Sequence, residues 1–490
     1  MILDEILDVL KRGNGDTAYI EKNISYTYNE LYRFVSNIYN FLLLNNTERK
    51  PVIVYGNKQI YMKATFLACS YAGMTYVPID ISMPEERVKL IINQVDPYCI
   101  IGDFESKDYK NISSIKIEDI MKEKNYNNIE KIYMKPEDIY YIIFTSGSTG
   151  IPKGVKVTYK NLDSCVKWLK KITKIQKGVV LNQAIFSFDL SVADLYLSLI
   201  SGSAHYILED ITTFNFSTIF EELKESDATL AVMTPSFADL LLTDKSFNKE
   251  LLPTLNTIIF CGEKLFNITV EKLYERFDGI KIINSYGPTE CTFAVTSIEL
   301  KKDNINESNI PVGRVKEDTN IFILDNEKNI LEENKIGEIL IVGNSVAEGY
   351  LEVPEKNPFI TYKGQKAYLT GDLGYMKDEI LYCAGRMDNQ IKFKGYRIEL
   401  SDIEKNFYDL NYIDKVKAIA KSSNKNTVTK LVAFVKLKNG INKNITEIKK
   451  DLEKKLPGYM IPSIKILEEF PLNNNGKTDI NRLRRIVNGE

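Results

Sequence analysis

A run of small and hydroxylated residues has the composition of a loop that binds a polyphosphate. Residues 140–154 read YYIIFTSGSTGIPKG, so an apolar stretch leads directly into the run. Small residues let the backbone approach an anion closely, and glycine permits conformations in which successive N–H groups point toward it. A flexible surface turn is the alternative, and the Walker A ending GKS or GKT is absent. The candidate phosphate ligands are Thr145, Ser146, Gly147, Ser148, Thr149 and Lys153.

Further motifs follow this loop along the chain. They read NSYGPTE at 284–290, YLTGD at 368–372, GRMDNQIK at 385–392, GYRIE at 395–399 and NGKTD at 475–479. Together with the loop, they resemble the signature sequences of the adenylate-forming superfamily, which includes acyl-CoA synthetases, luciferases and amino-acid adenylation domains. The resemblance implies an α/β fold with a large N-terminal domain of stacked sheets and helices, residues 1–387. A small, mobile α+β C-terminal domain would follow, residues 388–490.

The resemblance also implies the reaction. A carboxylate attacks the α-phosphate of ATP and pyrophosphate leaves, a step that depends on positioning and charge stabilisation. By resemblance Glu290 holds Mg²⁺, an ion that prefers carboxylate and phosphate oxygens; a solvated surface carboxylate is the alternative. Lys477 would enter the site from the C-terminal domain and bridge the carboxylate and the α-phosphate. Asp388 matches the hinge about which that domain rotates before a thiol attacks the acyl-adenylate.

The same resemblance assigns residues to the rest of the nucleotide. The loop at Thr145–Gly150 would bind the β- and γ-phosphates. Asp372 would accept hydrogen bonds from the ribose hydroxyls, with Arg386 fourteen residues later in the same clamp; a Gly-Asp pair alone would be only a turn signal. Three residues of the NSYGPTE motif complete the set: Asn284 at the adenine edge, Tyr286 stacked on adenine, and Thr289 at the α-phosphate.

Asp189 indicates that the activated acid is an amino acid. It stands in FSFDLSVAD at 186–194, where amino-acid-activating members pair a carboxylate with the substrate ammonium. A buried carboxylate needs such a partner; an N-cap of the following helix is the alternative. By motif alignment the pocket comprises Asp189, Leu190, Ala193, Ser236, Ile259, Cys261, Ser285, Phe293 and Ala294.

The residues around this pocket narrow the resemblance to the D-alanine–D-alanyl carrier protein ligases. The segments LNQAIFSFDLSV at 181–192 and FCGE at 260–263 carry it, and Cys261 is a distinctive match. Cys261 as a plain buried thiol is compatible with this role. Two residues depart from the expected pattern: Ala193 is smaller than expected and Phe293 larger, an exchange of volume that preserves or reshapes the pocket. The segment KFKG at 392–395 also lacks the His expected before its Gly.

Three alternatives stay open beside a D-alanine ligase that acts on a separate, phosphopantetheine-bearing carrier protein. One is a stand-alone peptide-synthetase adenylation enzyme for another amino acid. Another is a non-catalytic protein that kept the fold, against which the presence of Lys153, Glu290, Asp372, Arg386 and Lys477 argues. The third is a CoA ligase, against which Asp189 argues. The carrier is expected to be a separate protein because the 490-residue chain ends soon after the Lys477 motif.

Composition limits the other classes of function. The chain has 64 Lys and Arg against 66 Asp and Glu, which does not favour a broad nucleic-acid surface. Its single histidine, His205, excludes HExxH zinc chemistry and leaves one residue for any Ser-His-Asp triad. The six cysteines form no CxxC pair and are typical of buried thiols in a reducing compartment. The N-terminus lacks the features of a signal peptide, so we expect a cytoplasmic protein.

Strand and helix patterns alternate along the chain, which predicts an α/β fold with mostly parallel sheets. A capping box at Ser401–Glu404 is predicted to start the first helix of the C-terminal domain. The expected strands are 52–55, 140–145, 257–261, 281–284, 321–324, 338–342 and 390–393. The expected helices are 28–43, 161–172, 218–226 and 270–277.

Overall fold

The computed structural model describes most of the chain. Its described residues are 1–21, 24–104, 112–122, 128–147, 150–208, 216–301, 309–352, 357–387, 390–393, 395–422, 428–471 and 478–488. Four of the predicted site residues lie outside these ranges, namely Ser148, Thr149, Asp388 and Lys477.

The chain divides into two compact units. Unit 1 comprises Met1–Asp80, Val95–Ile143 and Gly154–Met387. Unit 2 comprises Ile81–Gln94, Phe144–Lys153 and Asp388–Glu490. Two short segments from the first third of the chain therefore group with the C-terminal residues, which the sequence did not predict.

One sheet has seven strands in the order β18-β8-β7-β4-β3-β5-β6. Its central strands read as continuous apolar runs because both faces of a parallel sheet are covered. The parallel strands are β3 (Val52–Gly56), β4 (Tyr76–Asp80), β5 (Cys99–Ile101), β6 (Ser113–Ile115) and β7 (Ile139–Thr145). At the other edge β8 (Lys153–Thr158) pairs antiparallel with β18 (Gly349–Tyr350).

A second sheet has 14 strands in the described part of the chain, and most strands in one half of it run parallel to one another. The parallel strands are β1 (Thr17–Glu21), β10 (Ala204–Ile207), β9 (Val179–Asn182), β11 (Leu230–Met233), β12 (Thr257–Phe260) and β13 (Lys281–Tyr286). The edge strand β2 (Ile24–Thr27) pairs antiparallel with β1. The α/β fold class and the parallel character of this half are confirmed.

The other half of this sheet is antiparallel, unlike the predicted pattern. Its strands are β14 (Thr296–Glu299), β15 (Gly313–Val315), β21 (Ile380–Arg386), β20 (Gln365–Lys377), β17 (Gly337–Gly343), β16 (Thr319–Leu324) and β19 (Phe359–Tyr362). A turn rather than a crossover helix joins β20 to β21. Between β20 and β21, Asp378 and Glu379 both have positive φ, 51° and 61°, as a two-residue hairpin turn requires.

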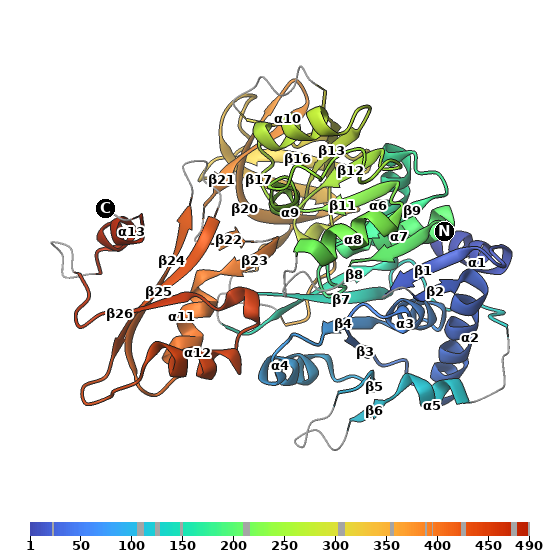
Figure 1. Ribbon diagram of the computed structural model, residues 1–490, viewed down its shortest axis with the longest axis horizontal. Helices are drawn as coiled ribbons and strands as arrows, with labels where there is room; N and C mark the ends of the chain where they lie inside the picture. The colour runs from blue at the N-terminus through green and yellow to red at the C-terminus, as the bar shows by residue number, and fades with distance from the viewer. Residues whose placement is uncertain are drawn as a thin grey trace. The chain divides into compact units, whose positions relative to one another are not determined.

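Helices cover the sheets of unit 1 (Figure 1). The predicted helices at 28–43, 161–172, 218–226 and 270–277 are confirmed with small shifts of their ends. They are α2 (Tyr28–Asn45), α6 (Tyr159–Thr173), α8 (Phe216–Ser226) and α10 (Asn267–Arg276). The remaining helices are α1 (Ile2–Arg12), α3 (Ile60–Tyr71), α5 (Ile117–Lys122), α7 (Ser191–Ser201) and α9 (Pro235–Leu241).

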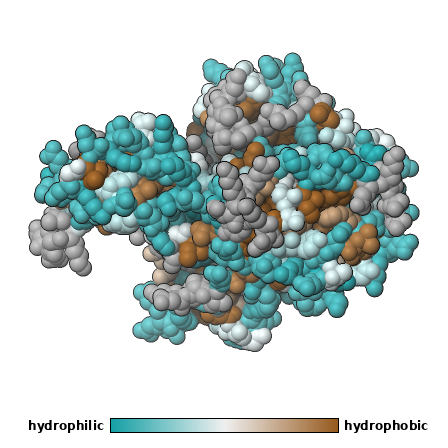
Figure 2. All heavy atoms as spheres, turned by 90° about the horizontal axis from the view of Figure 1, so that it is seen from below, coloured by the Kyte–Doolittle hydropathy of each residue, from teal (hydrophilic) through white to brown (hydrophobic). Residues whose placement is uncertain are grey.

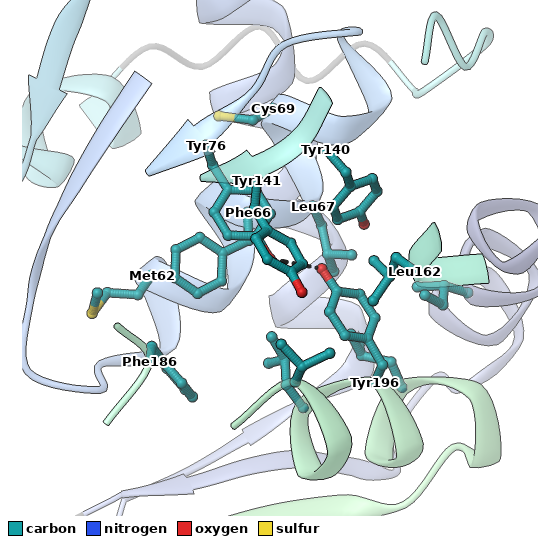
Figure 3. Packing of buried hydrophobic residues seen from close by; sticks show 14 of the residues in the cluster. Met62, Phe66, Leu67, Cys69, Tyr76, Tyr140, Tyr141, Leu162, Phe186 and Tyr196 are labelled. Carbon is teal, nitrogen blue, oxygen red and sulfur yellow. Dashed lines mark hydrogen bonds between the residues drawn. The ribbon is translucent and has the colours of Figure 1, made fainter. Parts of the chain in front are cut away.

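An aromatic cluster joins α3, β4, β7 and α7 in the core of unit 1 (Figure 3). Phe66 and Tyr76 stack with ring centroids 4.3 Å apart. The hydroxyl of Tyr196, from α7, lies 3.1 Å from that of Tyr76, from β4. Tyr140 and Tyr141 pack around them from β7. Because α7 follows directly on Asp189, this cluster anchors the helix behind the predicted amino-acid pocket.

Unit 2 has its own core. The hairpin of β22 (Gln390–Phe393) and β23 (Tyr396–Glu399) precedes a sheet of β24 (Ile413–Ser422), β25 (Val428–Leu437) and β26 (Ser463–Ile466). Its helices are α4 (Glu85–Val95, of which residues up to Gln94 belong to this unit), α11 (Leu400–Tyr408), α12 (Ile445–Glu453) and α13 (Ile480–Asn488).

The predicted capping box at Ser401–Glu404 is wrong. Helix α11 begins at Leu400 with Glu399 at its N-cap, so Ser401 lies inside the first turn. The carboxylate of Glu404 instead accepts a hydrogen bond from the main-chain N–H of Ala418 at 3.0 Å. The side chain of Glu404, which the local pattern assigned to the helix cap, is therefore hydrogen-bonded to strand β24 instead.

Hydrophilic residues cover most of the face seen in Figure 2, with hydrophobic residues in separate small groups. None of the helices in the described part of the chain combines the length and hydropathy that crossing a bilayer requires.

Candidate nucleotide and amino-acid site

Glu290 is a buried carboxylate held by a tyrosine. It lies in a short 3₁₀ turn, Thr289–Cys291, and is 1% exposed. The hydroxyl of Tyr350, from β18, donates a hydrogen bond to its Oε1 at 2.6 Å. Its main-chain oxygen accepts from the N–H of Ala347 at 2.9 Å. The alternative of a solvated surface carboxylate is therefore wrong.

The described residues form no metal cage of their own. No group of three or more His, Cys, Asp or Glu side chains within the described ranges could hold a metal ion. Magnesium bound with nucleotides usually takes one or two carboxylates and completes its shell with phosphate oxygens and water. The buried carboxylate of Glu290 fits that arrangement.

Asp372 and Arg386 face each other across the β20–β21 hairpin. They are register partners, and a guanidinium nitrogen of Arg386 lies 2.5 Å from Oδ1 of Asp372. The other carboxylate oxygen accepts from the hydroxyl of Tyr286 at 2.6 Å. Burial and the adjacent charge of Asp372 raise the pKa of Tyr286 well above its usual range, so it remains a neutral donor. Three predicted nucleotide ligands thus form one hydrogen-bonded group.

The remaining nucleotide residues of unit 1 lie close along the chain. Asn284 is buried on β13, and its side-chain amide donates to the carbonyl oxygen of Pro311 at 2.8 Å. Thr289 is buried at the start of the 3₁₀ turn. Gly287 is required between them, because a Cβ there would lie 2.6 Å from the Cα of Ala294. This close approach brings the NSYGPTE segment against the bend that carries Phe293 and Ala294.

The predicted phosphate loop belongs to unit 2, which includes residues Phe144–Lys153. The strand β7 that leads into the loop begins in unit 1. Thr145 ends β7 and Lys153 begins β8. Between them Gly150 has a φ of +77°, and its N–H donates to the carbonyl oxygen of Gly147 at 3.0 Å. A Cβ on Gly147 would lie 2.1 Å from the carbonyl oxygen of Ile151. The tight turn therefore needs both glycines.

Ser146 is the one hydroxyl of that loop whose contact is defined. It is buried and donates a hydrogen bond to the carbonyl oxygen of Arg397, in the same unit, at 2.8 Å. Of the other three predicted hydroxyl ligands, Thr145 is the last residue of β7, and Ser148 and Thr149 lie outside the described residues.

The predicted amino-acid pocket residues come together in unit 1. Asp189 is buried, and Leu190 occupies the N-cap of α7, so the alternative N-cap role of Asp189 is not observed. The thiol of Cys261 lies 3.8 Å from the main-chain oxygen of Phe293. The hydroxyl of Ser285 donates to the carbonyl oxygen of Phe260 at 2.7 Å. One continuous core cluster includes Leu190, Ala193, Ile259, Cys261, Phe293 and Ala294.

Two residues near this pocket were missed from the sequence. Burial, with further contributions from Tyr76, Cys165 and Asp189, raises the pKa of Tyr141 well above its usual range. Burial raises the pKa of Cys165 to about 12, and Cys261 adds to the shift. Tyr141 and Cys165 belong to the same core cluster as Cys261. Both residues looked like ordinary core positions, because one precedes the loop on a buried strand and the other lies on the apolar face of a helix.

Comparison with known protein families matches residues 8–351 to the family described as AMP-binding enzyme. The chain belongs to this family. It is 40% identical over 482 residues to the D-alanine–D-alanyl carrier protein ligase of Listeria monocytogenes serotype 4a (strain HCC23), with 94% of each chain covered. It is 34% identical to the protein of that name from Lactococcus lactis subsp. lactis (strain IL1403), with 100% and 99% covered. The predicted membership of the adenylate-forming superfamily is confirmed.

Solved structures show the same fold over the whole chain. The Vibrio cholerae adenylation domain AlmE, solved with glycyl-adenosine-5′-phosphate, has a TM-score of 0.86 at 22% identity, covering 100% of this chain and 98% of that one. The protein PA1221, which contains adenylation and PCP domains of a nonribosomal peptide synthetase, has a TM-score of 0.82 at 21% identity, covering 99% and 84%. The predicted α/β adenylation fold is confirmed.

Proposed function

We propose that this AMP-binding enzyme activates D-alanine with ATP and Mg²⁺ and transfers it to the phosphopantetheine thiol of a separate carrier protein in the cytoplasm. The observation that carries the proposal is the 40% identity, across 94% of both chains, to the D-alanine–D-alanyl carrier protein ligase of Listeria monocytogenes serotype 4a (strain HCC23). The proposed pocket supports it, because Asp189 is a buried carboxylate, and a substrate ammonium beside it would form a charge-assisted hydrogen bond.

In the first half-reaction, a carboxylate oxygen of the amino acid forms a bond to the α-phosphorus. The bond to the β-phosphate oxygen breaks, and pyrophosphate leaves with the electron pair. Asp189 orients the ammonium. Asp372, which is hydrogen-bonded to Arg386 and Tyr286, binds the ribose together with Arg386. Asn284, Tyr286 and Thr289 contact the base and the α-phosphate. The loop residues from Thr145 to Lys153 bind the outer phosphates.

Magnesium would supply charge neutralisation on the phosphate oxygens, and Glu290 would hold it. Lys477 would add a positive charge between the substrate carboxylate and the α-phosphate, where a compact ammonium stabilises several oxygens. In the second half-reaction the carrier thiolate attacks the acyl carbon and AMP leaves. Rotation about Asp388 would exchange the catalytic elements between the two steps.

The deciding experiment is ATP–pyrophosphate exchange across a panel of D- and L-amino acids. We expect D-alanine to give the highest kcat/KM, followed by D-alanine transfer to a phosphopantetheinylated carrier protein but not to its apo form. A preference for an L-amino acid would favour a stand-alone peptide-synthetase adenylation enzyme instead. The departures at Ala193 and Phe293 from the expected pocket motivate this second candidate. Exchange that does not depend on any amino acid would reject both.

A further inference from the structure

A buried polar network lies beneath the segment that carries Asp189. Residues 183–190 connect β9 to α7, and Asn182 is the last residue of β9. The side-chain nitrogen of Asn182 donates to Oδ1 of Asp194 at 3.1 Å and to the carbonyl oxygen of Ala184 at 2.9 Å. Nε2 of His205, on β10, lies 3.0 Å from the same Oδ1. The side chains of Asn182, Asp194 and His205 are fully buried.

The network contacts this segment at a second point through the imidazole of His205. The ring of Phe186 stacks on the imidazole with centroids 6.2 Å apart, and Tyr19 approaches it edge-on at 5.6 Å. Burial lowers the pKa of His205 well below its usual range, so the imidazole is neutral. Burial likewise raises the pKa of Asp194 well above its usual range. Because Oδ1 of Asp194 already accepts from Asn182, we treat Oδ1 as the acceptor of this contact too and place the imidazole proton on Nε2. The ring therefore fixes Phe186 while it donates to Asp194.

Helix α7 gives this network a rigid support. The hydroxyl of Tyr196 lies 3.1 Å from that of Tyr76 (Figure 3), and the ammonium of Lys63 lies 3.1 Å from the hydroxyl of Ser198. Asp194 is on the same helix, so its carboxylate is a fixed point. Any hydrogen bond that links it to residues 183–190 limits how far that segment can move.

Three acceptor atoms of this network have no partner within the described residues. They are Oδ1 of Asn182, Oδ2 of Asp194 and Nδ1 of His205. A buried polar atom without a partner is costly, so a network that serves only stability would be expected to satisfy them. The cost is consistent with a site whose geometry is kept for function.

We propose that Asp194, acting through Asn182 and His205, is a positioning residue for amino-acid recognition. It holds residues 183–190 in place and thereby fixes where the carboxylate of Asp189 meets the substrate ammonium. This inference rests on the proposed amino-acid activation. The nucleotide residues Glu290 and Asp372 lie on other elements, so loosening the segment affects amino-acid binding selectively.

The kinetic test compares Asn182→Ala, Asp194→Ala and Asp194→Asn in the full-length enzyme by ATP–pyrophosphate exchange. We expect the two alanine variants to raise the KM for the amino acid at least about tenfold and to change the KM for ATP less than about twofold. Asp194→Asn retains an oxygen that accepts from both donors and should recover most of the loss. Tyr39→Phe is the control, because it removes a partly buried hydrogen bond of the same unit, to the carbonyl oxygen of Lys131 at 2.9 Å.

A second measurement uses the wild-type protein and needs no variant to fold. His205 is the only histidine, so ¹⁵N-histidine labelling gives one imidazole whose resonances report this network alone. We expect the Nε2–H tautomer in the free enzyme. Saturation with D-alanine and a nonhydrolysable ATP analogue should shift its resonances, and the analogue alone should leave them in place.

Several outcomes would overturn the inference. The first is an equal rise of the KM values for the amino acid and for ATP in the alanine variants. The second is an amino-acid KM in these variants that equals that of the Tyr39→Phe control. The third is imidazole resonances that do not shift when D-alanine is added. If the wild type catalyses amino-acid-dependent exchange, these results reject the positioning role and leave the proposed function intact. If the wild type shows no such exchange with any amino acid, the proposed function fails, and the inference fails with it.

Discussion

The thiol of Cys261 lies 3.8 Å from the main-chain oxygen of Phe293. In the proposed amino-acid pocket, Cys261 is therefore in contact with the backbone of Phe293, whose ring would occupy neighbouring space. Thr292 and Phe293 both have positive φ, 58° and 69°. Two consecutive non-glycine residues in this region are strained, and such strain is common at functional sites.

Cys261→Ala should relax the discrimination between alanine enantiomers. If the hydrogen on the Cα of D-alanine faces Cys261, L-alanine would direct its methyl group into the sulfur. Overpacking of that size costs about 1–3 kcal/mol, which corresponds to roughly 5- to 150-fold discrimination. Measuring kcat/KM for both enantiomers should show a gain for L-alanine and little loss for D-alanine. An unchanged ratio would assign selectivity to Phe293 instead.

Asp189→Asn should abolish amino-acid activation and leave ATP binding intact. Only the substrate ammonium loses its partner, and breaking a buried charge pair costs about 3–5 kcal/mol. Exchange assays with amino-acid titration, and calorimetric titration with an ATP analogue, separate the two effects. Asp163→Asn is a suitable control, since Asp163 is also a buried carboxylate but accepts from the main-chain N–H of Ile2. A near-normal amino-acid KM in Asp189→Asn would place the pocket elsewhere.

Asp372→Asn should weaken ATP binding through the ribose. A hydrogen bond to a charged group contributes about 1.5–3 kcal/mol, so the KM for ATP should rise about 10- to 150-fold. With 2′-deoxy-ATP the wild type should lose affinity, and the variant should lose little more. Arg314→Ala is the control, because it breaks an exposed pair with Glu379 on the same sheet. Equal penalties for the deoxy substrate in both enzymes would mean that Asp372 does not contact that hydroxyl.

Tyr350→Phe should reduce the rate of adenylation about tenfold, because the carboxylate of Glu290 loses the donor that orients it. Glu290→Gln should cost more, about 10²–10³ in rate, because the charge itself is lost. Titration of Mg²⁺ at saturating ATP should show a higher half-maximal concentration in both variants. Tyr274→Phe removes a comparable hydroxyl, bonded to the carbonyl oxygen of Leu300 at 2.6 Å, and should leave the titration unchanged. If the half-maximal Mg²⁺ concentration in both the Glu290 and the Tyr350 variants equals that of the wild type, Mg²⁺ does not bind at this carboxylate.

Lys63→Met should stabilise the protein at pH 7 and flatten its pH dependence. Burial lowers the pKa of Lys63 to about 7, although the charge of Asp194 acts in the opposite direction. An unfolded lysine has a pKa of about 10.4. Between these values the unfolded chain binds more protons, so the free energy of unfolding rises with pH by up to about 1.4 kcal/mol per unit. Below about pH 7 both states are protonated and this contribution is constant. Urea unfolding at pH 7 and 9 should show the slope in the wild type and a reduced slope in Lys63→Met.

Equal slopes in the two proteins would mean that Lys63 remains charged in the folded state. Lys171→Met, at an exposed position, should leave both the stability and the slope unchanged.

Local patterns in the sequence were sufficient for most elements, because helix and strand periodicity and end signals are short-range. The strand expected at 281–284 is β13, and the helix expected at 161–172 is α6. The prediction from local pattern was wrong at Ser401–Glu404. The side chain of Glu404 accepts a hydrogen bond from Ala418 on a neighbouring strand and does not cap the helix. The local pattern also did not predict the antiparallel half of the large sheet. Strand direction there depends on the connections, such as the turn at Asp378 and Glu379 that joins β20 to β21.

The family could be recognised from the sequence, because its motifs are contiguous and their residue types follow from the chemistry of binding a nucleotide. The contacts between side chains that are far apart in the chain become visible only in the folded protein. Tyr350 reaches Glu290 from sixty residues away, and Asp194 joins Asn182 to His205 beneath the segment that carries Asp189. Such contacts depend on strand register and on the packing of whole elements, which no local spacing encodes. Burial, which lowers the pKa of Lys63 and of His205, is likewise a property of the folded core alone.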